Sequence, residues 1–586
     1  MNKAAIYHVS FSNFAFPVSD NSLKLRIKAA RGDLKKVKVI YGPRFNINNR
    51  EPNYCQKMKL SGSDLEHDYF TATIFLDDPR FRYHFLLNDG QKTLWYNERG
   101  FFENRPRGYD SGFFQYSLIT KDDIIDKPNW LNNAVVYQIF PERFYNGNKS
   151  LNPENCQKWG EKPDRNSFFG GDLQGILEKV DYLKNLGVNV IYLTPIFKSP
   201  TNHKYNIDDY YQIDPHFGDK DTAKKLVEEA HNREIKVIFD AVFNHSGYNF
   251  FAFRDLREKG ENSKYKDWYK YQSLPLKTEP PLNYETFARD IPTLPKLNTA
   301  NPEVQDYLLN VTKYWMEYLN IDGWRLDVAD EVAPSFWVRF RKLVKKINPE
   351  AYILGEVWHN GQKWLQGQHF DGIMNYSFTQ TLIDFFAKKN IGPVEFDARL
   401  TKNRMKYKEQ VSKSLLNLLD SHDTARFLNH SRQQIDALKL AVLLQMTYTG
   451  IPLIYYGDEV GLSGGEDPDN RRCMPWKKSK QNRELFDFYQ KLIKIRKKYP
   501  TLQKGNFESF LIDESRNIYG YKRYFKQKII YVIINNSSVK HKIRLDKKIP
   551  AGKKYNDILN EKKYKYQKEK QNFTITIKAH SGVILI

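Results

Sequence analysis

Short apolar runs alternate with helical segments from about residue 130 to residue 500, and no other feature of the sequence restricts the fold as strongly. Eight of these runs are typical of buried strands, at 134–140, 188–193, 236–242, 322–328, 352–357, 371–376, 415–420 and 451–456. Strands that alternate with helices pair in parallel, because each helix returns the chain to the same end of the sheet. Eight such repeats predict an α/β fold, a parallel (β/α)8 TIM barrel.

The helical segment at 172–187 shows the spacing expected of a helix packed on a sheet. Its apolar residues recur at i, i+3, i+4 and i+7 on a single face: Leu173, Ile176, Leu177, Val180 and Leu183. Asp172 is placed to cap this helix and Gly187 to end it. A later helix has Pro302 in its first turn, where proline is tolerated.

The chain on either side of the barrel has a different pattern. Residues 1–122 contain short runs of period-two alternation separated by turn residues, which predict an N-terminal β-sandwich. The alternation returns at 501–586, so we expect a C-terminal β-sandwich after a barrel that occupies 123–500. Residues 246–301, after the third strand, are rich in Tyr, Pro and Lys, and they predict an inserted subdomain at the carboxyl ends of the strands.

The chain is strongly basic, with 92 Lys and Arg against 69 Asp and Glu and a formal net charge of +23. Such a balance can mark a nucleic-acid binder, whose affinity would depend steeply on salt. The lysines are spread along the chain, however, and the densest segment, 553–571, resembles the solvated faces of short strands and turns. No zinc-finger, RNP-like or helix-turn-helix pattern occurs. We therefore expect no nucleic-acid partner.

The cysteines and the N-terminal segment indicate the compartment. Cys55, Cys156 and Cys473 lie far apart, which argues against a disulfide framework and against a cysteine-based zinc site. The N-terminus has no apolar signal segment, and no stretch of about 18 apolar residues occurs. These observations predict a soluble cytoplasmic protein without a membrane partner.

Polar residues gather where four of the predicted strands end. In a barrel of parallel strands, the carboxyl ends of the strands meet at one rim, and side chains there can act together. The third, fourth, fifth and seventh strands place there the following acids, histidines and other polar residues: Asp240, Asn244, His245, Arg325, Asp327, Glu356, Asp420, His422 and Asp423. Any one of them can be explained as a cap or a structural ion pair, but the convergence of the set indicates a catalytic rim.

The two carboxylates at the ends of neighbouring strands suit glycoside hydrolysis. Arg325 and Asp327 point the same way on one strand, so the guanidinium group should keep Asp327 ionised, either as a structural ion pair or as a nucleophile. We expect Glu356, between apolar neighbours, to lie in apolar surroundings that raise its pKa and suit a proton donor. Adjacent strands are ~4.8 Å apart. The pair can therefore reach the separation of about 5 Å that a retaining mechanism needs.

Four segments that carry these residues resemble the signature regions of the α-amylase superfamily of glycoside hydrolases: "DAVFNH" (240–245), "GWRLDVADE" (323–331), "GEVW" (355–358) and "LLDSHD" (418–423). More narrowly, "LPKLN" (294–298), "GEVWH" (355–359) and "SFFGGDLQGI" are similar to the neopullulanase, cyclomaltodextrinase and maltogenic amylase group. The N-terminal part resembles the starch-binding-type domain of that group. The resemblance covers essentially the whole chain.

The resemblance implies a role for each matching catalytic residue. Asp327 would be the nucleophile, Glu356 the general acid and base, and Asp423 the group that holds sugar hydroxyls in the transition state. Asp240 matches a structural position behind them.

The resemblance also implies substrate contacts. The residues that match the binding positions of the sugar at the cleavage point are Tyr205, His245, Arg325 and His422. Trp358 and Glu331 match positions on the acceptor side, where water and a sugar hydroxyl compete for the intermediate. The sequence departs from the group at Asp330, Asn206 and Leu294, where the group usually has Asn, Asp and Met. The first two departures could change substrate choice and the balance between hydrolysis and transfer.

Relatives often carry a structural calcium ion beside the first barrel strand, so the resemblance implies a possible Ca2+ cofactor. The matching ligand positions are Asn146, Asn148, Asn152, the Gly170 carbonyl and Asp172. Asparagines dominate this set, and calcium affinity depends on the number of carboxylates. We therefore expect a weak structural site and no catalytic metal.

The function that follows is retaining hydrolysis of α-1,4-glucosidic bonds in cyclodextrins, pullulan and maltooligosaccharides, with transglycosylation as a side activity. The resemblance also implies a homodimer in which the N-terminal domain of one chain covers the active site of the other. The alternative is a non-catalytic carbohydrate-binding or transporter-associated barrel, but such barrels typically lack one of the three carboxylates, and all three occur here.

Overall fold

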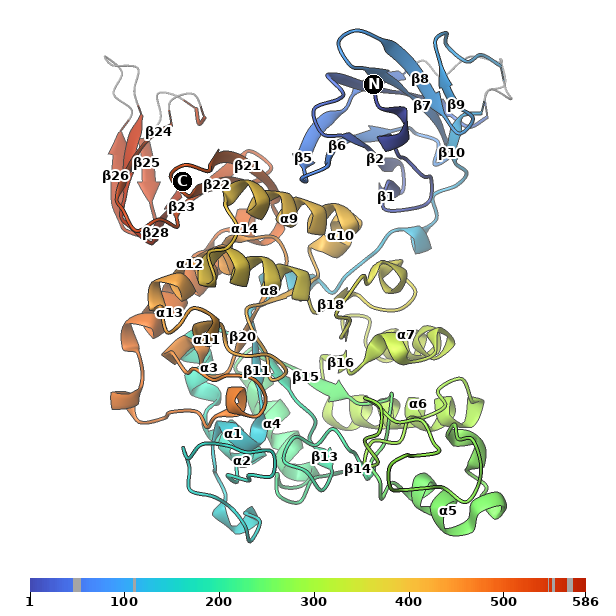
Figure 1. Cartoon of the computed structure of the whole chain (residues 1–586), viewed down its shortest axis with the longest axis vertical. Coiled ribbons are helices and arrows are strands. Elements are labelled where there is room, and N and C mark those ends of the chain that lie inside the picture. The colour runs from blue at the N-terminus through green and yellow to red at the C-terminus, as the bar shows by residue number, and fades with distance from the viewer. Residues whose placement is uncertain (46–53, 109–111, 546–547, 551–553, 566–572) are drawn as a thin grey trace.

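A computed structural model describes the chain except residues 46–53, 109–111, 546–547, 551–553 and 566–572. The barrel forms the body of the molecule, and the N-terminal and C-terminal β-domains both lie at its upper end in Figure 1. Strands β5 (Lys59–Ser63) and β21 (Asn506–Asp513), one from each β-domain, both contact α9 (Pro393–Lys406) of the barrel.

The eight predicted strands form one parallel sheet that closes on itself. In sheet order the strands are β11 (Val136–Ile139), β12 (Val190–Leu193), β15 (Lys236–Ala241), β16 (Gly323–Leu326), β17 (Tyr352–Gly355), β18 (Gly372–Ile373), β19 (Leu416–Leu418) and β20 (Ile451–Tyr455). β11 pairs with β20, and a parallel bridge between Met374 and Leu416 joins β18 to β19. The (β/α)8 barrel is thereby confirmed, with strands shorter than the apolar runs that predicted them.

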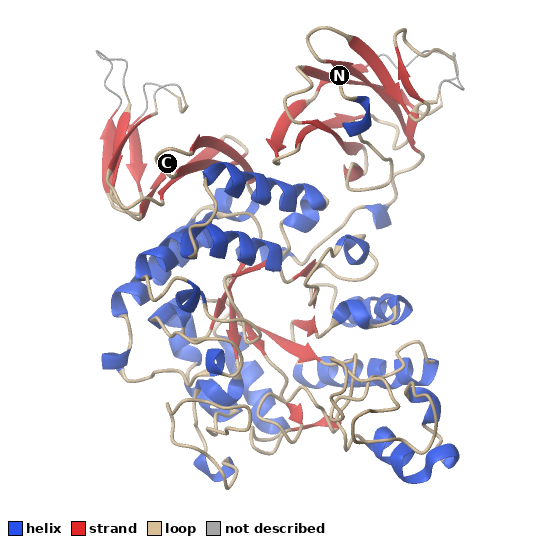
Figure 2. Cartoon of the chain, in the orientation of Figure 1, coloured by secondary structure: helices blue, strands red, loops and turns tan. Residues whose placement is uncertain are grey.

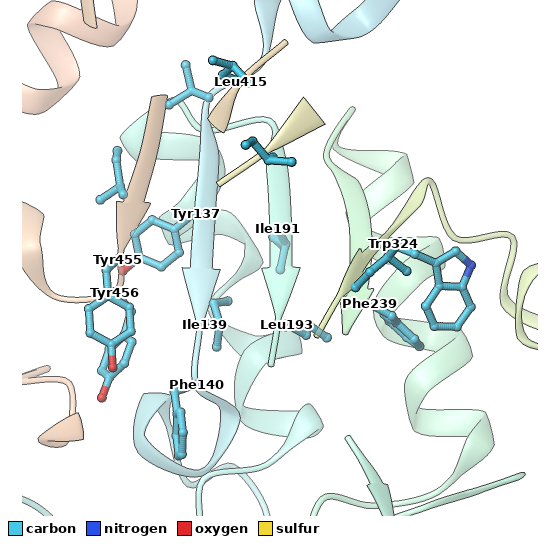
Figure 3. Close-up of a cluster of buried hydrophobic side chains, with 14 of the residues drawn as sticks. Tyr137, Ile139, Phe140, Ile191, Leu193, Phe239, Trp324, Leu415, Tyr455 and Tyr456 are labelled. Atoms are coloured by element: carbon cyan, nitrogen blue, oxygen red, sulfur yellow. The ribbon is translucent and has the colours of Figure 1, made fainter. Parts of the chain in front are cut away.

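Side-chain alternation along the strands separates the interior of the barrel from its helix-covered surface. Outward-facing residues pack under the helices in the main core, among them Tyr137, Ile191, Phe239 and Trp324 (Figure 3). The interior begins with an apolar layer that includes Val136, Val190, Ile238, Tyr352, Leu416 and Ile451. Two residues further along β11, β12 and β15, the inward positions are the polar Gln138, Tyr192 and Asp240, whereas Leu354, Leu418 and Leu453 extend the apolar layer on the other side. The catalytic rim therefore lies above a largely apolar floor.

The helices that surround the strands are visible in Figure 2. The longer ones are α4 (Lys220–Asn232), α6 (Pro302–Leu319), α7 (Pro334–Ile347), α9, α12 (Ile435–Thr447) and α13 (Arg483–Lys498). Pro302 is the first residue of α6, as predicted. A shorter helix, α8 (Tyr376–Leu382), follows β18.

The single helix predicted over 172–187 is two helices, α2 (Leu173–Glu178) and α3 (Val180–Leu186). The Asp172 side chain caps α2 and Gly187 ends α3 with φ 97°, so both termini were predicted correctly. Lys179 interrupts the helix with φ −105° and ψ 4°, and its Nζ lies 3.7 Å from the ring centroid of Tyr145. Local spacing does not reveal this tertiary contact.

The N-terminal domain contains two antiparallel sheets, of strand order β1-β2-β6-β5 and β4-β3-β7-β8-β9, with β10 paired to β7. Their bounds are β1 (Ala15–Ser19), β2 (Ser22–Ala30), β3 (Lys36–Pro43), β4 (Tyr54–Lys57), β5, β6 (His67–Phe75), β7 (Phe81–Asn88), β8 (Thr93–Asn97), β9 (Gly100–Phe102) and β10 (Phe114–Tyr116). Their facing apolar residues form a separate core.

The C-terminal domain has a six-stranded sheet of order β21-β22-β23-β28-β25-β26 and a two-stranded sheet, β24-β27. The strands after β21 are β22 (Ile518–Phe525), β23 (Lys528–Asn535), β24 (His541–Arg544), β25 (Lys554–Asp557), β26 (Lys562–Lys565), β27 (Thr574–Ile577) and β28 (Ser581–Leu585). Within the basic segment 553–571, β25 and β26 are strands as expected, whereas residue 553 and residues 566–571 lie outside the described residues.

The segment between β15 and α6 contains α5 (Phe251–Lys259) and otherwise short turns joined by isolated bridges. Two of these bridges, His245 to Lys296 and Tyr269 to Leu297, tie the insertion to itself and to the end of β15. The insertion therefore lies beside the rim of the barrel. Among the described residues, the helices are all too short or too polar to cross a membrane.

Candidate active site

Arg325 is the centre of the cluster at the barrel rim. Its side chain is fully buried, and its Nη1 lies 2.7 Å from Oδ1 of Asp327, the residue directly after β16, as expected for side chains two residues apart in an extended segment. Nη2 of the same guanidinium lies 2.9 Å from Oε1 of Glu356, which follows β17. The register of β16 and β17 pairs Leu326 with Gly355, so the two carboxylates leave neighbouring strands at the same level. One guanidinium therefore holds both carboxyl groups at the rim.

Asp240, at the end of β15, supports this centre from behind. Its two oxygens lie 2.9 and 3.1 Å from Nη1 of Arg325. The hydroxyls of Tyr192 and Tyr205 donate to Oδ2 of Asp240 at 2.7 and 3.0 Å. Both oxygens of Asp240 already have hydrogen-bond partners, and only 1 % of the residue is exposed. Asp240 is therefore placed to orient Arg325 and not to contact a ligand.

The surroundings of Glu356 differ from the sequence-based expectation, which was wrong in calling them apolar. Besides the Arg325 contact, Oε2 accepts a hydrogen bond from the backbone N–H of Val328 at 3.0 Å, and Oε1 accepts one from Nε1 of Trp358 at 3.2 Å. The apolar residues next to Glu356 in the sequence, such as Leu354, face the barrel interior below it. Two of the contacts of Glu356, those with Arg325 and Val328, come from the neighbouring strand β16 and the loop after it, which the residues next to Glu356 in the sequence do not indicate.

His422 and Asp423, after β19, form the opposite wall. Nε2 of Gln138 donates to Nδ1 of His422 at 2.8 Å, which leaves Nε2 of His422 as the donor toward the cleft. That nitrogen lies 2.6 Å from the Tyr205 hydroxyl and 3.1 Å from Oδ2 of Asp423. Asp423 also lies 3.5 Å from Nη2 of Arg471, and 28 % of its side chain is exposed to the cavity.

Burial and crowding of acids control protonation in this cluster. Burial raises the pKa of Asp327 well above its usual range, and Glu356 and Asp240 add to this effect while Arg325 opposes it. Burial, reinforced by Glu356, raises the pKa of Asp423 to about 7. The expectation that Arg325 alone keeps Asp327 ionised is thus incomplete, because the guanidinium is shared. A buried cluster of acids around one arginine retains a proton, which is a requirement for general acid catalysis.

The two histidines of the cluster stay neutral. Burial lowers the pKa of His422 well below its usual range, with Arg325 acting in the same direction, and it lowers the pKa of His245 to about 3. Nε2 of His245 donates to the backbone oxygen of Tyr205 at 3.1 Å, and the His245 ring stacks on Phe287 with centroids 5.0 Å apart. Neutral imidazoles can hydrogen-bond sugar hydroxyls without adding charge to the site.

A cavity of about 670 Å³ lies over this cluster. Seven of the nine residues expected to act on substrate line its walls: Tyr205, His245, Asp327, Glu331, Glu356, Trp358 and Asp423. The other two, Arg325 and His422, lie beneath the surface. Trp358 is 43 % exposed and stacks face to face on Tyr376, with ring centroids 3.8 Å apart. The departures at Asn206, Leu294 and Asp330 also line the cavity. The structure therefore gathers the predicted residues around one volume.

Several residues of the site were missed by sequence reasoning. Gln138 and Tyr192 are inward-facing residues of β11 and β12, and strand alternation could have found them. Arg471 comes from a loop after the last strand, and Phe287 comes from the insertion, where no periodicity predicts direction. Tyr376 follows β18 and was overlooked because it carries no charge.

The five residues expected to bind calcium lie together beside β11. The Asp172 carboxylate accepts the backbone N–H groups of Gly147, Asn148 and Gly175 at 2.6–3.1 Å. Asn146 donates to Oδ1 of Asn152 at 2.9 Å. A side chain at position 170, where φ is 76°, would clash with both asparagines, so only glycine fits there. Oδ1 of Asn146 is buried without a hydrogen-bond partner. The donor set thus fits a cation weakly, because one oxygen is free while the carboxylate already serves the backbone.

A parallel (β/α)8 barrel with two arginine-held carboxylates and a third acid at one rim defines a glycoside hydrolase. Residues 138–505 match the family described as alpha amylase, catalytic domain, and residues 1–120 match the alpha amylase N-terminal ig-like domain. The chain belongs to the α-amylase family.

Within that family, the chain is a glycoside hydrolase of the cyclomaltodextrinase, neopullulanase and maltogenic amylase type. It is 46 % identical over 570 residues to a cyclomaltodextrinase of Thermoanaerobacter pseudethanolicus, covering 96 % of this chain and 97 % of the relative. It is 44 % identical over 584 residues to neopullulanase 2 of Thermoactinomyces vulgaris, covering 99 % of both. A solved cyclomaltodextrinase structure matches with a TM-score of 0.95 and 40 % identity over 100 % of both chains.

Proposed function

We propose that this enzyme hydrolyses α-1,4-glucosidic bonds of cyclodextrins, pullulan and maltooligosaccharides with retention of configuration, and that it transfers glycosyl groups as a side activity. The observation that carries the proposal is the shared guanidinium of Arg325, which holds the Asp327 and Glu356 carboxyls on its two terminal nitrogens. Retaining glycosidases need two carboxyl groups about 5 Å apart, one charged and one protonated.

In the first step, a carboxylate oxygen of Asp327 attacks the anomeric carbon while Glu356 gives its proton to the departing glycosidic oxygen. A glycosyl ester on Asp327 forms and the glycosidic bond breaks. Arg325 favours the attack by Asp327 because its positive charge stabilises the anionic nucleophile. A sugar in the cavity also displaces water from Asp327 and Glu356.

In the second step, Glu356 accepts a proton from water, and the hydroxide equivalent attacks the same carbon and releases Asp327. When a sugar hydroxyl occupies the place of water, the product is a longer glucan. Trp358 and Glu331 line the cavity at this side, where the two nucleophiles compete.

The remaining cavity residues hold the sugar at the cleavage point. Tyr205 offers a ring for the apolar face of a glucose unit, and its nearly parallel stacking with His422, 3° between planes, fixes that ring. At the cavity wall, His245 can hydrogen-bond sugar hydroxyls and ionised Asp423 can accept hydrogen bonds from them. His422, beneath the wall, orients Tyr205 and Asp423. Such bonds strengthen as the ring flattens toward the transition state, which lowers the barrier.

The experiment that tests this proposal is a product profile on β-cyclodextrin, pullulan and soluble starch, with Asp327→Asn and Glu356→Gln as matched controls. We expect wild-type activity on the first two and a loss of about 10³-fold or more in each variant. A wild-type protein inactive on all three substrates would contradict the proposal. Comparable rates on starch and cyclodextrin would contradict a narrow cleft.

We further propose a homodimer in which the N-terminal domain of one chain narrows the cleft of the other. Support comes from the exposed large apolar side chains of that domain, among them Phe11, Phe45 and Leu65. Light scattering after size exclusion tests it, and a monomer at micromolar concentration would contradict it.

A cytoplasmic location remains a proposal as well. A relative from Bacillus subtilis, 39 % identical over 551 residues, is named an intracellular maltogenic amylase, which supports this location. Cell fractionation followed by an activity assay tests the location, and activity confined to the culture medium would contradict it.

We propose that calcium, where it binds, is structural, with Asn146 and Asn152 turning their amide oxygens to it beside Asp172. The measurement is the melting temperature with calcium and with a chelator. A rise of a few degrees that Asn146→Ala abolishes supports this site, and an unchanged melting temperature contradicts it.

A further inference from the structure

A small cavity of about 110 Å³, which we call the junction cavity, lies where the three domains of the chain meet. Its walls come from β2, β5 and β6 of the N-terminal domain, α9 and α10 (Glu409–Ser412) of the barrel, and β21 and β22 of the C-terminal domain. In Figure 1, α9 lies beneath β5 and β21, and it contacts both strands. A water molecule takes about 30 Å³, so the junction cavity has room for a small ion and not for a glucan.

The wall of the junction cavity carries more positive than negative charge. Its four cationic residues are Lys24, Arg26, Arg404 and Lys413. Among the described residues of this wall, Glu409 is the only acid. The Glu409 carboxylate lies 3.0 Å from Nζ of Lys24 and 2.9 Å from Nζ of Lys413, so it already serves both lysines. The wall therefore has a formal excess of three positive charges.

The two guanidinium groups of the wall bond to neutral oxygens. Nη1 of Arg26 donates to the carbonyl oxygen of Met405 at 2.6 Å, and the Arg26 residue is only 3 % exposed. Among the described residues, its buried Nε has no hydrogen-bond partner. Arg404 donates to the hydroxyls of Tyr448 and Thr401 at 3.0 and 2.8 Å. A cation that has lost water without gaining a negative partner is unfavourable, so this wall can gain energy from an anion.

Two further buried guanidinium groups lie behind the junction cavity. Arg523 donates to the carbonyl oxygen of Gly505 at 2.7 Å, and Arg496 donates to that of Gly450 at 2.6 Å. Burial lowers the pKa of Arg496 to about 9 and that of Arg523 to about 10. Burial also lowers the pKa of Arg26 to about 10. All three charges are therefore only partly stabilised by their surroundings.

Lys127, in the linker between the N-terminal domain and the barrel, lies in the same positive region. Its Nζ donates to the carbonyl oxygen of Lys413 at 2.9 Å. Burial lowers the pKa of Lys127 to about 7, and Lys413, Arg496 and Lys504 act in the same direction. Three cations that disfavour a fourth are expected where positive charge exceeds negative charge.

We propose that the junction cavity binds a small tetrahedral oxyanion, such as inorganic phosphate or sulfate. The ion supplies the negative charge that faces Arg26 and Arg404, and its oxygens can accept hydrogen bonds from the ammonium groups of Lys24 and Lys413. Hydroxyl groups of the same wall can donate to the remaining oxygens. Because the wall is built from all three domains, the bound ion stabilises their arrangement.

Thermal unfolding of the full chain at pH 7 tests the proposal, with phosphate or sulfate compared with chloride at equal ionic strength. The melting temperature should rise by about 1–3 °C and level off at millimolar oxyanion, because the ion binds only the folded chain. Exclusion of salt from the protein surface would instead give a rise that does not saturate. Titration calorimetry with phosphate should show one site per chain. Calorimetry without a saturable heat would overturn the proposal.

Two substitutions separate anion binding from the loss of an ion pair, because each of them breaks the Lys24–Glu409 pair. Lys24→Met should weaken phosphate binding by about 10-fold or more, since it removes a donor and leaves the carboxylate to repel the ion. Glu409→Gln should tighten phosphate binding by about 5-fold or more, because it removes that repulsion. In phosphate-free buffer, both variants should be less stable than the wild type.

The matched control is Lys439→Met. Lys439 pairs with Glu484 and has 18 % of its side chain exposed, against 20 % for Lys24, but it does not line the junction cavity. This control should bind phosphate within twofold of the wild type. Changes of the same sign in Lys24→Met and Glu409→Gln, or wild-type affinity in both, would overturn the proposal.

Discussion

Nη2 of Arg325 lies 2.9 Å from Oε1 of Glu356, although the other terminal nitrogen of the same guanidinium holds Asp327 at 2.7 Å. The arginine therefore contacts the nucleophile and the acid at once, two groups that need opposite protonation states. It can do so because its fork presents two nitrogens in one plane, which a lysine cannot.

Arg325→Lys should lower kcat by about 10²- to 10³-fold, because a single ammonium cannot hold both carboxyls in register. Steady-state kinetics on β-cyclodextrin measures this effect. The matched control is Arg341→Lys, where the arginine pairs with Asp371 away from the cavity and Lys345 pairs with the same carboxylate. Retention of more than a tenth of wild-type kcat in Arg325→Lys would contradict the shared role.

The acidic limb of the kcat/KM profile should lie near pH 7, because burial and Glu356 raise the pKa of Asp423 to about 7 and only its ionised form accepts bonds from two sugar hydroxyls. Asp423→Asn should lower kcat/KM by about 10²-fold or more. The activity that remains should no longer fall on the acidic side of the profile. A limb that stays in place in the variant would assign it to another group.

The same pKa predicts a stability effect with a definite sign. Between about pH 4, where the unfolded carboxyl ionises, and about pH 7, the folded protein keeps the Asp423 proton that the unfolded chain releases. The wild type therefore loses stability over this window as the pH rises, and Asp423→Asn should not. The melting temperature of the variant relative to the wild type should increase between pH 4 and pH 7; a constant difference would contradict the shift.

Gln138→Leu should raise KM and lower kcat/KM by about 10-fold, because the amide that fixes the His422 tautomer is lost. His422 would then turn away from Tyr205 and Asp423. Separate measurement of kcat and KM, together with the melting temperature, checks this prediction. If Gln138 only stabilised the fold, the variant would have a lower melting temperature and an unchanged KM.

Glu409 lies between the N-terminal domain and the barrel, 3.0 Å from Lys24 and 2.9 Å from Lys413. These lysines outweigh burial and lower its pKa to about 2. Glu409→Gln should destabilise the fold by up to about 1 kcal/mol at pH 7, since the carboxylate is partly exposed. The contribution is present above about pH 4.3 and is lost as the pH falls toward 2, so the two melting temperatures should converge at pH 2. A difference that persists there would mean that the ion pairs are not its cause.

The sequence predicted the barrel well because the strand interiors are continuous apolar runs and because charged residues break them at one end. Asp327, Glu356 and Asp423 follow three such runs, so their common rim could be derived before any coordinates. The ends of the strands were predicted less accurately, because the apolar run in the sequence can extend beyond the last residue that is hydrogen-bonded to the next strand. Val357 is an example, since β17 ends at Gly355.

Contacts between segments distant in the sequence could not be predicted. Glu356 pairs with the Arg325 guanidinium and accepts the backbone N–H of Val328, and only the folded register brings these two groups to its carboxyl. Likewise, the contact of Lys179 with the Tyr145 ring and the Lys296–Glu331 ion pair join segments that are distant in the sequence.

The central claim is that Asp327 forms a covalent glycosyl intermediate with Glu356 as acid and base. The most direct test is ¹H NMR of the first sugar released from maltotriose, before mutarotation. Two displacements at the anomeric carbon predict that the α-anomer appears first; initial release of the β-anomer would contradict the account.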